Sequence, residues 1–227
     1  SEGTIEIRSH GVEKSIYTAI ENQGLEIVDA TCPFVLKIHR IVEEDSMAGN
    51  QIVIIGNEKH PEVVGIMGWC VNEPKVIEST QEAEFLQLSE DRKVSIVSQT
   101  TFNYNKFKDL VEIISKKGYD VCVYNTICNA TEERQTEARD LAQSVDAMVV
   151  IGGKNSSNTQ KLYEISKKEC VNTYYIQTLV DLDLTIFESS SRVGITAGAS
   201  TPNNIIKEVH GSMTENFAEM FEESCNN

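Results

Sequence analysis

The sequence has few of the features that mark exported, membrane-spanning or nucleic-acid-binding proteins. Its 227 residues contain no apolar run of 18 residues, and the start SEGTIEIRSHG lacks the basic and apolar segments of a signal peptide. Six cysteines are present without a C-x-x-C pair, which is typical of a reducing compartment. A net charge of −15 argues against a nucleic-acid-binding surface. We therefore expect a cytoplasmic protein with no membrane or nucleic-acid partner in this region.

Two stretches of the chain repeat the same order of features. Cys32 precedes Gly56 by 24 positions (56 − 32), and Cys128 precedes Gly152 by 24 positions (152 − 128). Each stretch predicts a turn with a cysteine, a helix, a strand, a polar loop with glycine and a further helix.

A second pattern occurs three times, at residues 4–24, 93–118 and 192–211. Each copy is a β-branched strand, a small polar loop and a helix that closes near glycine, with Gly24 and Gly118 as expected C-caps. Alternating strands and helices with short loops predict parallel sheets. The expected fold is α/β, a pseudo-threefold repeat of small parallel-sheet domains around a central site.

The repeats also predict domain boundaries. The expected parts are the C-terminal half of a first α/β domain, a second and a third α/β domain, and an acidic tail or linker, at residues 1–31, 32–124, 125–210 and 211–227. The first domain is incomplete in this scheme, so we expect a further half-repeat before Ser1 that carries another cysteine.

Apolar spacing predicts which helix faces are buried. Phe107, Leu110, Val111 and Ile114 fall on one stripe of a helix. Phe34, Ile38, Ile41 and Val42 are expected to form the buried face of another.

Small polar loops follow the predicted strands. They are Ser9 to Gly11, His60 to Glu62, Gln99 to Thr101, Asn155 to Asn158 and Gly198 to Ser200. Taken one at a time, capping and turn formation explain such residues, and a single histidine is more often structural than a ligand. Because the loops hold equivalent places in a repeated fold, we expect several helix N-termini to bind one phosphate or diphosphate.

Cys32 and Cys128 hold equivalent places, each after a strand and before a helix. A helix N-terminus favours a negatively charged thiolate. With a third cysteine from the preceding half-repeat, the pair would form a site of three thiolates, which suits an iron–sulfur cluster or a zinc ion with an open position. The other four cysteines are expected to be ordinary buried thiols.

Seven ordered motifs, covering residues 5 to about 210, resemble the LytB (IspH) family of 4-hydroxy-3-methylbut-2-enyl diphosphate reductases. They are RSHGV, DATCP, GNEKHPEV, SQTT, TICNATEERQ, KNSSN and TAGASTP. The resemblance implies three α/β domains around a [4Fe-4S] cluster that three cysteines hold, with one iron open to the substrate. It also implies a ferredoxin or flavodoxin as electron donor.

The resemblance also implies roles for single residues. Cys32 and Cys128 match cluster ligands, and the third ligand is expected upstream of Ser1. Glu62 matches the proton donor, and Thr100 the threonine beside the substrate hydroxyl. The residues that match the diphosphate ligands are His10, His60, Ser156, Ser157, Asn158 and Ser200. Without its first cysteine the chain is expected to be impaired, and its acidic end resembles a linker to the RNA-binding repeats that some members carry.

The sequence is also compatible with three functions other than the reductase. The first is a phosphate-ester-binding module or sugar-phosphate isomerase, which would use the same loops without iron. The second is a non-catalytic interaction domain that works through its acidic surface. The third is a zinc hydrolase.

Overall fold

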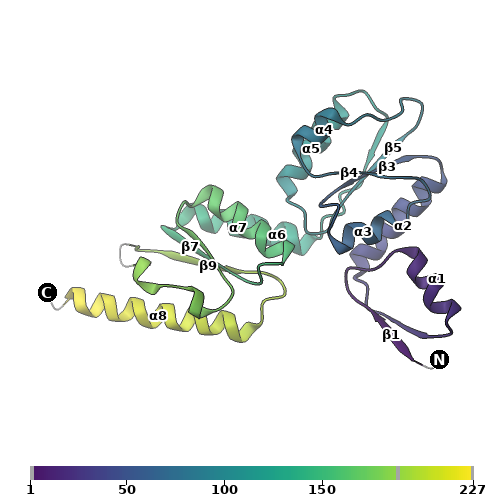
Figure 1. Ribbon diagram of the computed structural model, residues 1–227. Helices are drawn as coiled ribbons and strands as arrows, with labels where there is room; N and C mark the ends of the chain where they lie inside the picture. Colours follow the sequence, from purple (N-terminus) through teal and green to yellow (C-terminus); the bar gives the residue numbers. More distant parts are fainter. Residues whose placement is uncertain (1–2, 188–189, 226–227) are drawn as a thin grey trace. The chain divides into compact units, whose positions relative to one another are not determined.

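The computed structural model describes residues 3–187 and 190–225 (Figure 1). The contacts divide the chain into two compact units, residues 1–128 and residues 129–227. All strand pairs in the described part of the chain are parallel, and they form three small sheets. The prediction of a repeated parallel α/β fold is therefore confirmed.

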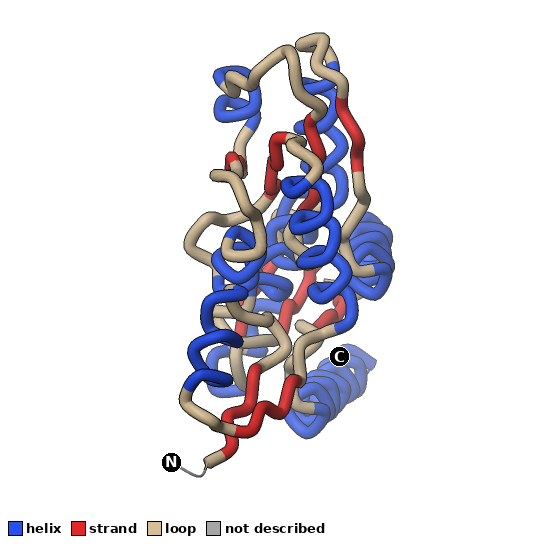
Figure 2. Tube along the Cα trace, turned by 90° about the vertical axis from the view of Figure 1, so that its right-hand side faces the viewer, coloured by secondary structure: helices blue, strands red, loops and turns tan. Residues whose placement is uncertain are grey.

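The first unit begins with a two-stranded sheet. Strands β1 (Thr4–Ile7) and β2 (Glu26–Asp29) are joined through helix α1 (Lys14–Asn22). Figure 2 shows the two strands next to the N-terminus. Gly24 follows α1 with φ +66°, the left-handed conformation in which glycine commonly ends a helix.

The second sheet of this unit has the strand order β4-β3-β5-β6. Its strands are β3 (Gln51–Ile55), β4 (Lys75–Ile77), β5 (Val94–Ser98) and β6 (Val121–Val123). Its helices are α2 (Pro33–Met47), α3 (Pro61–Met67), α4 (Thr80–Phe85) and α5 (Tyr104–Ser115). The two central strands are almost entirely buried, which explains their β-branched apolar sequences.

Alternate residues of strand β3 enter two different cores. Val53 and Ile55 pack with residues of α5, whereas Ile52 and Ile54 pack with residues of α2 and α3. The sheet is thus covered on both faces, and its strands end in loops on one side, where polar residues lie.

The second unit is a three-stranded sheet of order β8-β7-β9. Its elements are α6 (Asn129–Ser144), β7 (Ala147–Ile151), α7 (Ser157–Glu169), β8 (Thr173–Ile176), β9 (Val193–Ala197), α8 (Asn203–Cys225) and the 3-10 turns η1 (Leu179–Asp181) and η2 (Leu184–Phe187). The central strand β7 is fully buried. Val150 packs with residues of α6 and α7, and Val149 packs with residues of α8.

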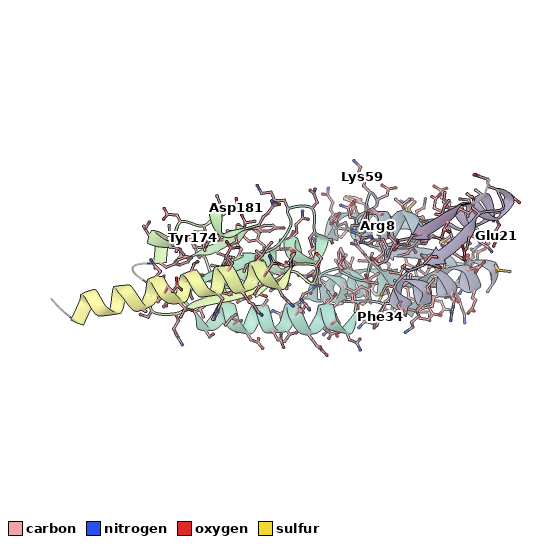
Figure 3. All side chains as sticks on the ribbon, turned by 90° about the horizontal axis from the view of Figure 1, so that it is seen from below. Arg8, Glu21, Phe34, Lys59, Tyr174 and Asp181 are labelled. Atoms are coloured by element: carbon pink, nitrogen blue, oxygen red, sulfur yellow. The ribbon has the colours of Figure 1, made fainter. Side chains whose placement is uncertain are left out.

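The prediction for the buried face of α2 is partly wrong. Phe34 is 41% exposed (Figure 3). The buried residues are Val35, Ile38, His39, Val42 and Ser46, a stripe at i, i+3, i+4, i+7 and i+11 that includes a histidine and a serine. A prediction from apolar residues alone includes Phe34 and leaves out His39, so the predicted stripe is rotated about the helix axis relative to the buried one.

The two units do not follow the predicted domain boundaries. The first unit ends after Cys128, four residues beyond the predicted boundary at 124, and it includes both residues 1–31 and the four-stranded sheet. Residues 211–227, predicted as an acidic tail or linker, begin within α8, where Met213 is buried in the core of the second unit. The division into three domains stays a prediction.

The cysteines outside the predicted ligand pair are not all buried. Cys170 is buried and Cys70 is partly buried, but Cys122 is exposed because β6 is an edge strand. The side chain of Cys225 lies outside the described part of the chain. Among the described residues, no helix has both the length and the apolar character needed to span a bilayer.

Candidate functional site

Two predicted histidines meet where the two sheets of the first unit come together. His10 lies in the loop after β1, and His60 lies in the loop between β3 and α3. Their ring centroids are 5.5 Å apart, in an edge-to-face arrangement of 75°. His10 is exposed and His60 is half-buried. His10 and His60 are fifty positions apart in the sequence, but the fold brings their imidazole groups next to each other.

The hydrogen bond that His60 accepts identifies which of its two ring nitrogens carries the proton. His60 is the N-cap of α3, and its Nδ1 accepts the backbone N–H of Glu62 at 3.2 Å. A ring nitrogen that accepts a hydrogen bond carries no proton, so the proton of the neutral ring is on Nε2. Burial, together with the neighbouring His10, lowers the pKa of His60 and favours this neutral form. Nε2–H is then a donor available to an anion.

Glu62 and Thr100 form a buried pair two residues beyond His60. Thr100 donates its backbone N–H to Glu62 Oε1 at 2.6 Å and its hydroxyl to Oε2 at 2.7 Å. Glu62 is 2% exposed, and this burial raises the pKa of its carboxyl, against the lowering effect of the two Thr100 hydrogen bonds. A carboxyl with a raised pKa can hold and release a proton near neutral pH.

Backbone hydrogen bonds connect both predicted cysteine ligands to these residues. Cys32 directly precedes α2, and its N–H donates to the carbonyl oxygen of Ser9, next to His10. Cys128 directly precedes α6, and its N–H donates to the carbonyl oxygen of Thr100. Each cysteine is thus fixed to a loop that carries a candidate ligand or acid.

The donor chemistry of these cysteines fits part of an iron–sulfur site. Cys32 and Cys128 are free and partly exposed, and thiolates are the usual ligands of such clusters. Within the described part of the chain, no group of three histidine, cysteine or acidic side chains is arranged to hold a metal ion. Two cysteines alone therefore do not complete a three-thiolate site.

The loop that carries His10 is held by His39 and Trp69, which the sequence did not single out, and by the conformation of Gly11. Gly11 has φ +67°, and a Cβ there would lie 2.7 Å from Cε1 of His39. His39 is stacked on Trp69, with ring centroids 5.0 Å apart at 16°. Trp69 Nε1 donates to the carbonyl oxygen of Val12 at 2.9 Å. The position of His39 in the α2 stripe, four residues after Val35, is the signal that could have found it.

The remaining predicted residues lie in the second unit. Ser156 is the N-cap of α7, Ser157 begins the helix, and Ser200 is exposed in the loop after β9. Asn158 is 8% exposed, and its Nδ2 has no hydrogen-bond partner among the described residues. A buried amide without a partner costs free energy, which indicates a place for a ligand or water oxygen.

The sheets and loops together define a class of protein. It is an α/β protein whose first unit presents two histidines, two free thiols and one buried carboxyl in its loops, and whose second unit presents serine hydroxyls and an amide in loops of its own. The LytB protein family matches residues 1–214, and the chain belongs to this family.

Named relatives agree with this assignment. The 4-hydroxy-3-methylbut-2-enyl diphosphate reductase of Caldanaerobacter subterraneus subsp. tengcongensis is 47% identical over 203 residues, which is 89% of this chain and 70% of the relative. The solved E-1-hydroxy-2-methyl-but-2-enyl-4-diphosphate reductase from Plasmodium falciparum is similar with a TM-score of 0.89 at 27% identity, covering 93% of this chain and 67% of that one.

A second solved structure is closer in sequence. It is (E)-4-hydroxy-3-methyl-but-2-enyl diphosphate reductase, described as the terminal enzyme of the non-mevalonate pathway, with 42% identity and a TM-score of 0.61 over 93% of this chain and 76% of that chain. The resemblance inferred from the seven motifs is therefore confirmed.

Proposed function

We propose that this chain is a 4-hydroxy-3-methylbut-2-enyl diphosphate reductase of isoprenoid biosynthesis. The allylic C–O bond of the substrate breaks, and two electrons and two protons convert the hydroxyl group into water and form a C–H bond. The products are isopentenyl and dimethylallyl diphosphate, which differ in the carbon that receives the proton. Family membership favours this reaction over the three alternatives.

The diphosphate would be bound by neutral donors. His60 offers Nε2–H because its Nδ1 is already an acceptor, and His10 lies beside it. In the second unit, the unpartnered Nδ2 of Asn158 is suited to a phosphate oxygen. The hydroxyl groups assigned to the same role are those of Ser156, Ser157 and Ser200. Donors at helix N-termini suit an anion even in a chain with strong net negative charge.

Glu62 would provide the proton that the leaving hydroxyl group needs. Burial raises the pKa of its carboxyl, which increases the fraction that carries a proton at a given pH, and Thr100 donates to both of its oxygens. Thr100 would in turn orient the substrate hydroxyl toward the carboxyl. The main support for the proposal is this buried pair of Glu62 and Thr100, whose Thr100 carbonyl oxygen accepts a hydrogen bond from the N–H of Cys128.

Cys32 and Cys128 would hold a [4Fe-4S] cluster together with a third thiolate. When bound, the cluster supplies the electrons and an iron that acts as a Lewis acid on oxygen. The electron donor would be a ferredoxin or a flavodoxin. We place the reaction in the cytoplasm because the five described cysteines are all free thiols.

An anaerobic assay of the longest natural polypeptide that contains this chain tests the proposal. A reduced viologen dye supplies electrons, and mass spectrometry identifies the products. We expect Glu62→Gln to lower the turnover rate at least about a hundredfold, the usual contribution of a general acid. Inorganic pyrophosphate affinity should change less than twofold.

Cys122→Ser provides the control, since Cys122 is an exposed thiol on the edge strand β6 and is not one of the predicted ligands. It should leave turnover unchanged, whereas Cys32→Ser should abolish turnover. Ligand binding that needs neither cysteine, with no dye oxidation by the unsubstituted protein, would favour the iron-free phosphate-ester module instead.

A further inference from the structure

Thr159 is a buried residue with no role among the predicted ligands. It is the third residue of α7, directly after Asn158, and it is 0% exposed. Both of its donors reach Ser156, and its hydroxyl also interacts with the Tyr175 side chain. The backbone N–H donates to Ser156 Oγ at 3.3 Å, and the hydroxyl donates to the same oxygen at 2.9 Å.

These two bonds limit what Ser156 can do. A serine hydroxyl has one proton to donate and two positions at which it can accept. The two bonds from Thr159 occupy both accepting positions of Ser156. Its hydroxyl can therefore interact with a further partner only by donating its proton. Ser156 is then a donor only, which matches an anion because ionised phosphate oxygens only accept.

The Thr159 hydroxyl also lies between the ends of two strands. A Cβ at Gly152, after β7, would be 2.5 Å from Thr159 Oγ1, and a Cβ at Gly198, after β9, would be 2.1 Å from it. Both distances are too short for any side chain. The loops that lead to Ser156 and Ser200 therefore pack on the same hydroxyl group.

A neighbouring threonine fixes the second loop. Thr201 donates its hydroxyl to the carbonyl oxygen of Ile151 at 3.0 Å, and the N–H of Gly198 donates to the same oxygen at 2.9 Å. The loop around Ser200 is thus tied to the end of β7. The Thr159 hydroxyl thus lies between two connected strand ends, where it donates to Ser156.

We propose that Thr159 is a positioning residue for diphosphate binding, which commits the Ser156 hydroxyl to donate its proton to a phosphate oxygen. Thr159 does not touch the ligand and acts only through Ser156. The inference rests on the proposed function, in which Ser156 is a ligand of the diphosphate.

Two substitutions at residue 159 distinguish the contribution of the hydroxyl group from that of the methyl group. Thr159→Val keeps the shape of the side chain and the backbone N–H but removes the hydroxyl donor. Thr159→Ser keeps the hydroxyl and removes the methyl group. Ser166→Ala is the matched control, since Ser166 lies on the same helix, is 0% exposed, and its hydroxyl has no partner among the described residues.

Titration calorimetry of the whole chain with inorganic pyrophosphate measures the effect, and circular dichroism checks that each variant is folded. We expect Ser156→Ala and Thr159→Val each to weaken binding about tenfold, the usual effect of losing one hydrogen bond to a charged group. Thr159→Ser and Ser166→Ala should stay within about twofold of the natural chain.

The double variant Ser156→Ala with Thr159→Val gives the decisive result. Because Thr159 acts only through Ser156, the double variant should bind as weakly as Ser156→Ala and no weaker. Additive losses, or normal binding by Thr159→Val while Ser156→Ala is weak, would overturn the inference and leave the proposed function standing. If Ser156→Ala binds normally, or the natural chain does not bind pyrophosphate, the diphosphate role of Ser156 fails and the inference fails with it.

Discussion

Acid should weaken the first unit through His39. Its imidazole is 1% exposed, and neither ring nitrogen has a hydrogen-bond partner in the described part of the chain. Burial lowers the pKa of His39 from 6.5 to about 4, although the carboxylates of Asp29 and Glu43 favour the charged form. The folded chain therefore keeps His39 neutral at a pH where the unfolded chain protonates it.

The sign and size of the effect follow from these two pKa values. Between pH 6.5 and pH 4 the unfolded chain binds more protons, so stability falls as the pH falls. From pH 7 to pH 5 the loss through His39 alone is about 2 kcal/mol, and below pH 4 it levels off at about 3 kcal/mol.

Trp69 reports this change directly because it is the single tryptophan and is stacked on His39. Urea unfolding followed by tryptophan fluorescence at pH 7, 6 and 5 compares the natural chain with His39→Phe and His39→Gln. All other titrating groups are common to the three proteins. The natural chain should lose about 2 kcal/mol more than either variant between pH 7 and pH 5. Equal losses in all three proteins would show that protonation of His39 does not destabilise the fold.

Three further substitutions test the loops. Gly11→Ala should lower the free energy of unfolding by about 2 kcal/mol in urea titrations, because φ is +67° and its Cβ would meet His39; an unchanged midpoint would contradict this. His60→Asn keeps an N-cap acceptor but removes the Nε2–H donor, so calorimetry should show pyrophosphate bound about tenfold more weakly with stability nearly unchanged. Trp69→Phe removes the bond to Val12, and pyrophosphate affinity should fall severalfold; equal affinity would show that the His10 loop is fixed without it.

Local patterns were enough to predict the architecture. The β-branched run of β3 and the stripe at Phe107, Leu110 and Ile114 correspond to a buried strand and a buried helix face. Equal spacing from Cys32 and Cys128 to the following glycines reflects two similar helix–strand units, α2 with β3 and α6 with β7. The sequence did not predict that these elements would divide after Cys128, since that depends on contacts between segments distant in the sequence.

The supporting residues were harder to predict because their roles depend on tertiary partners. His39 is polar, so an apolar stripe passes over it, yet Trp69 and Gly11 make it part of the core. Thr159 follows a recognisable motif, but only the folded chain shows that its hydroxyl lies between two glycines. The roles of the predicted ligands stay predictions, although His10 with His60 and Glu62 with Thr100 are in contact.

The iron and acid-labile sulfide content after anaerobic reconstitution tests directly whether Cys32 and Cys128 hold an iron–sulfur cluster. The longest natural polypeptide containing this chain is compared with its Cys32→Ser, Cys128→Ser and Cys122→Ser variants. We expect about four iron and four sulfide per polypeptide in the natural and Cys122→Ser proteins, and a large loss in the other two. Full cluster content in Cys32→Ser and Cys128→Ser, or no cluster in the natural polypeptide, would contradict the assignment of these cysteines as ligands.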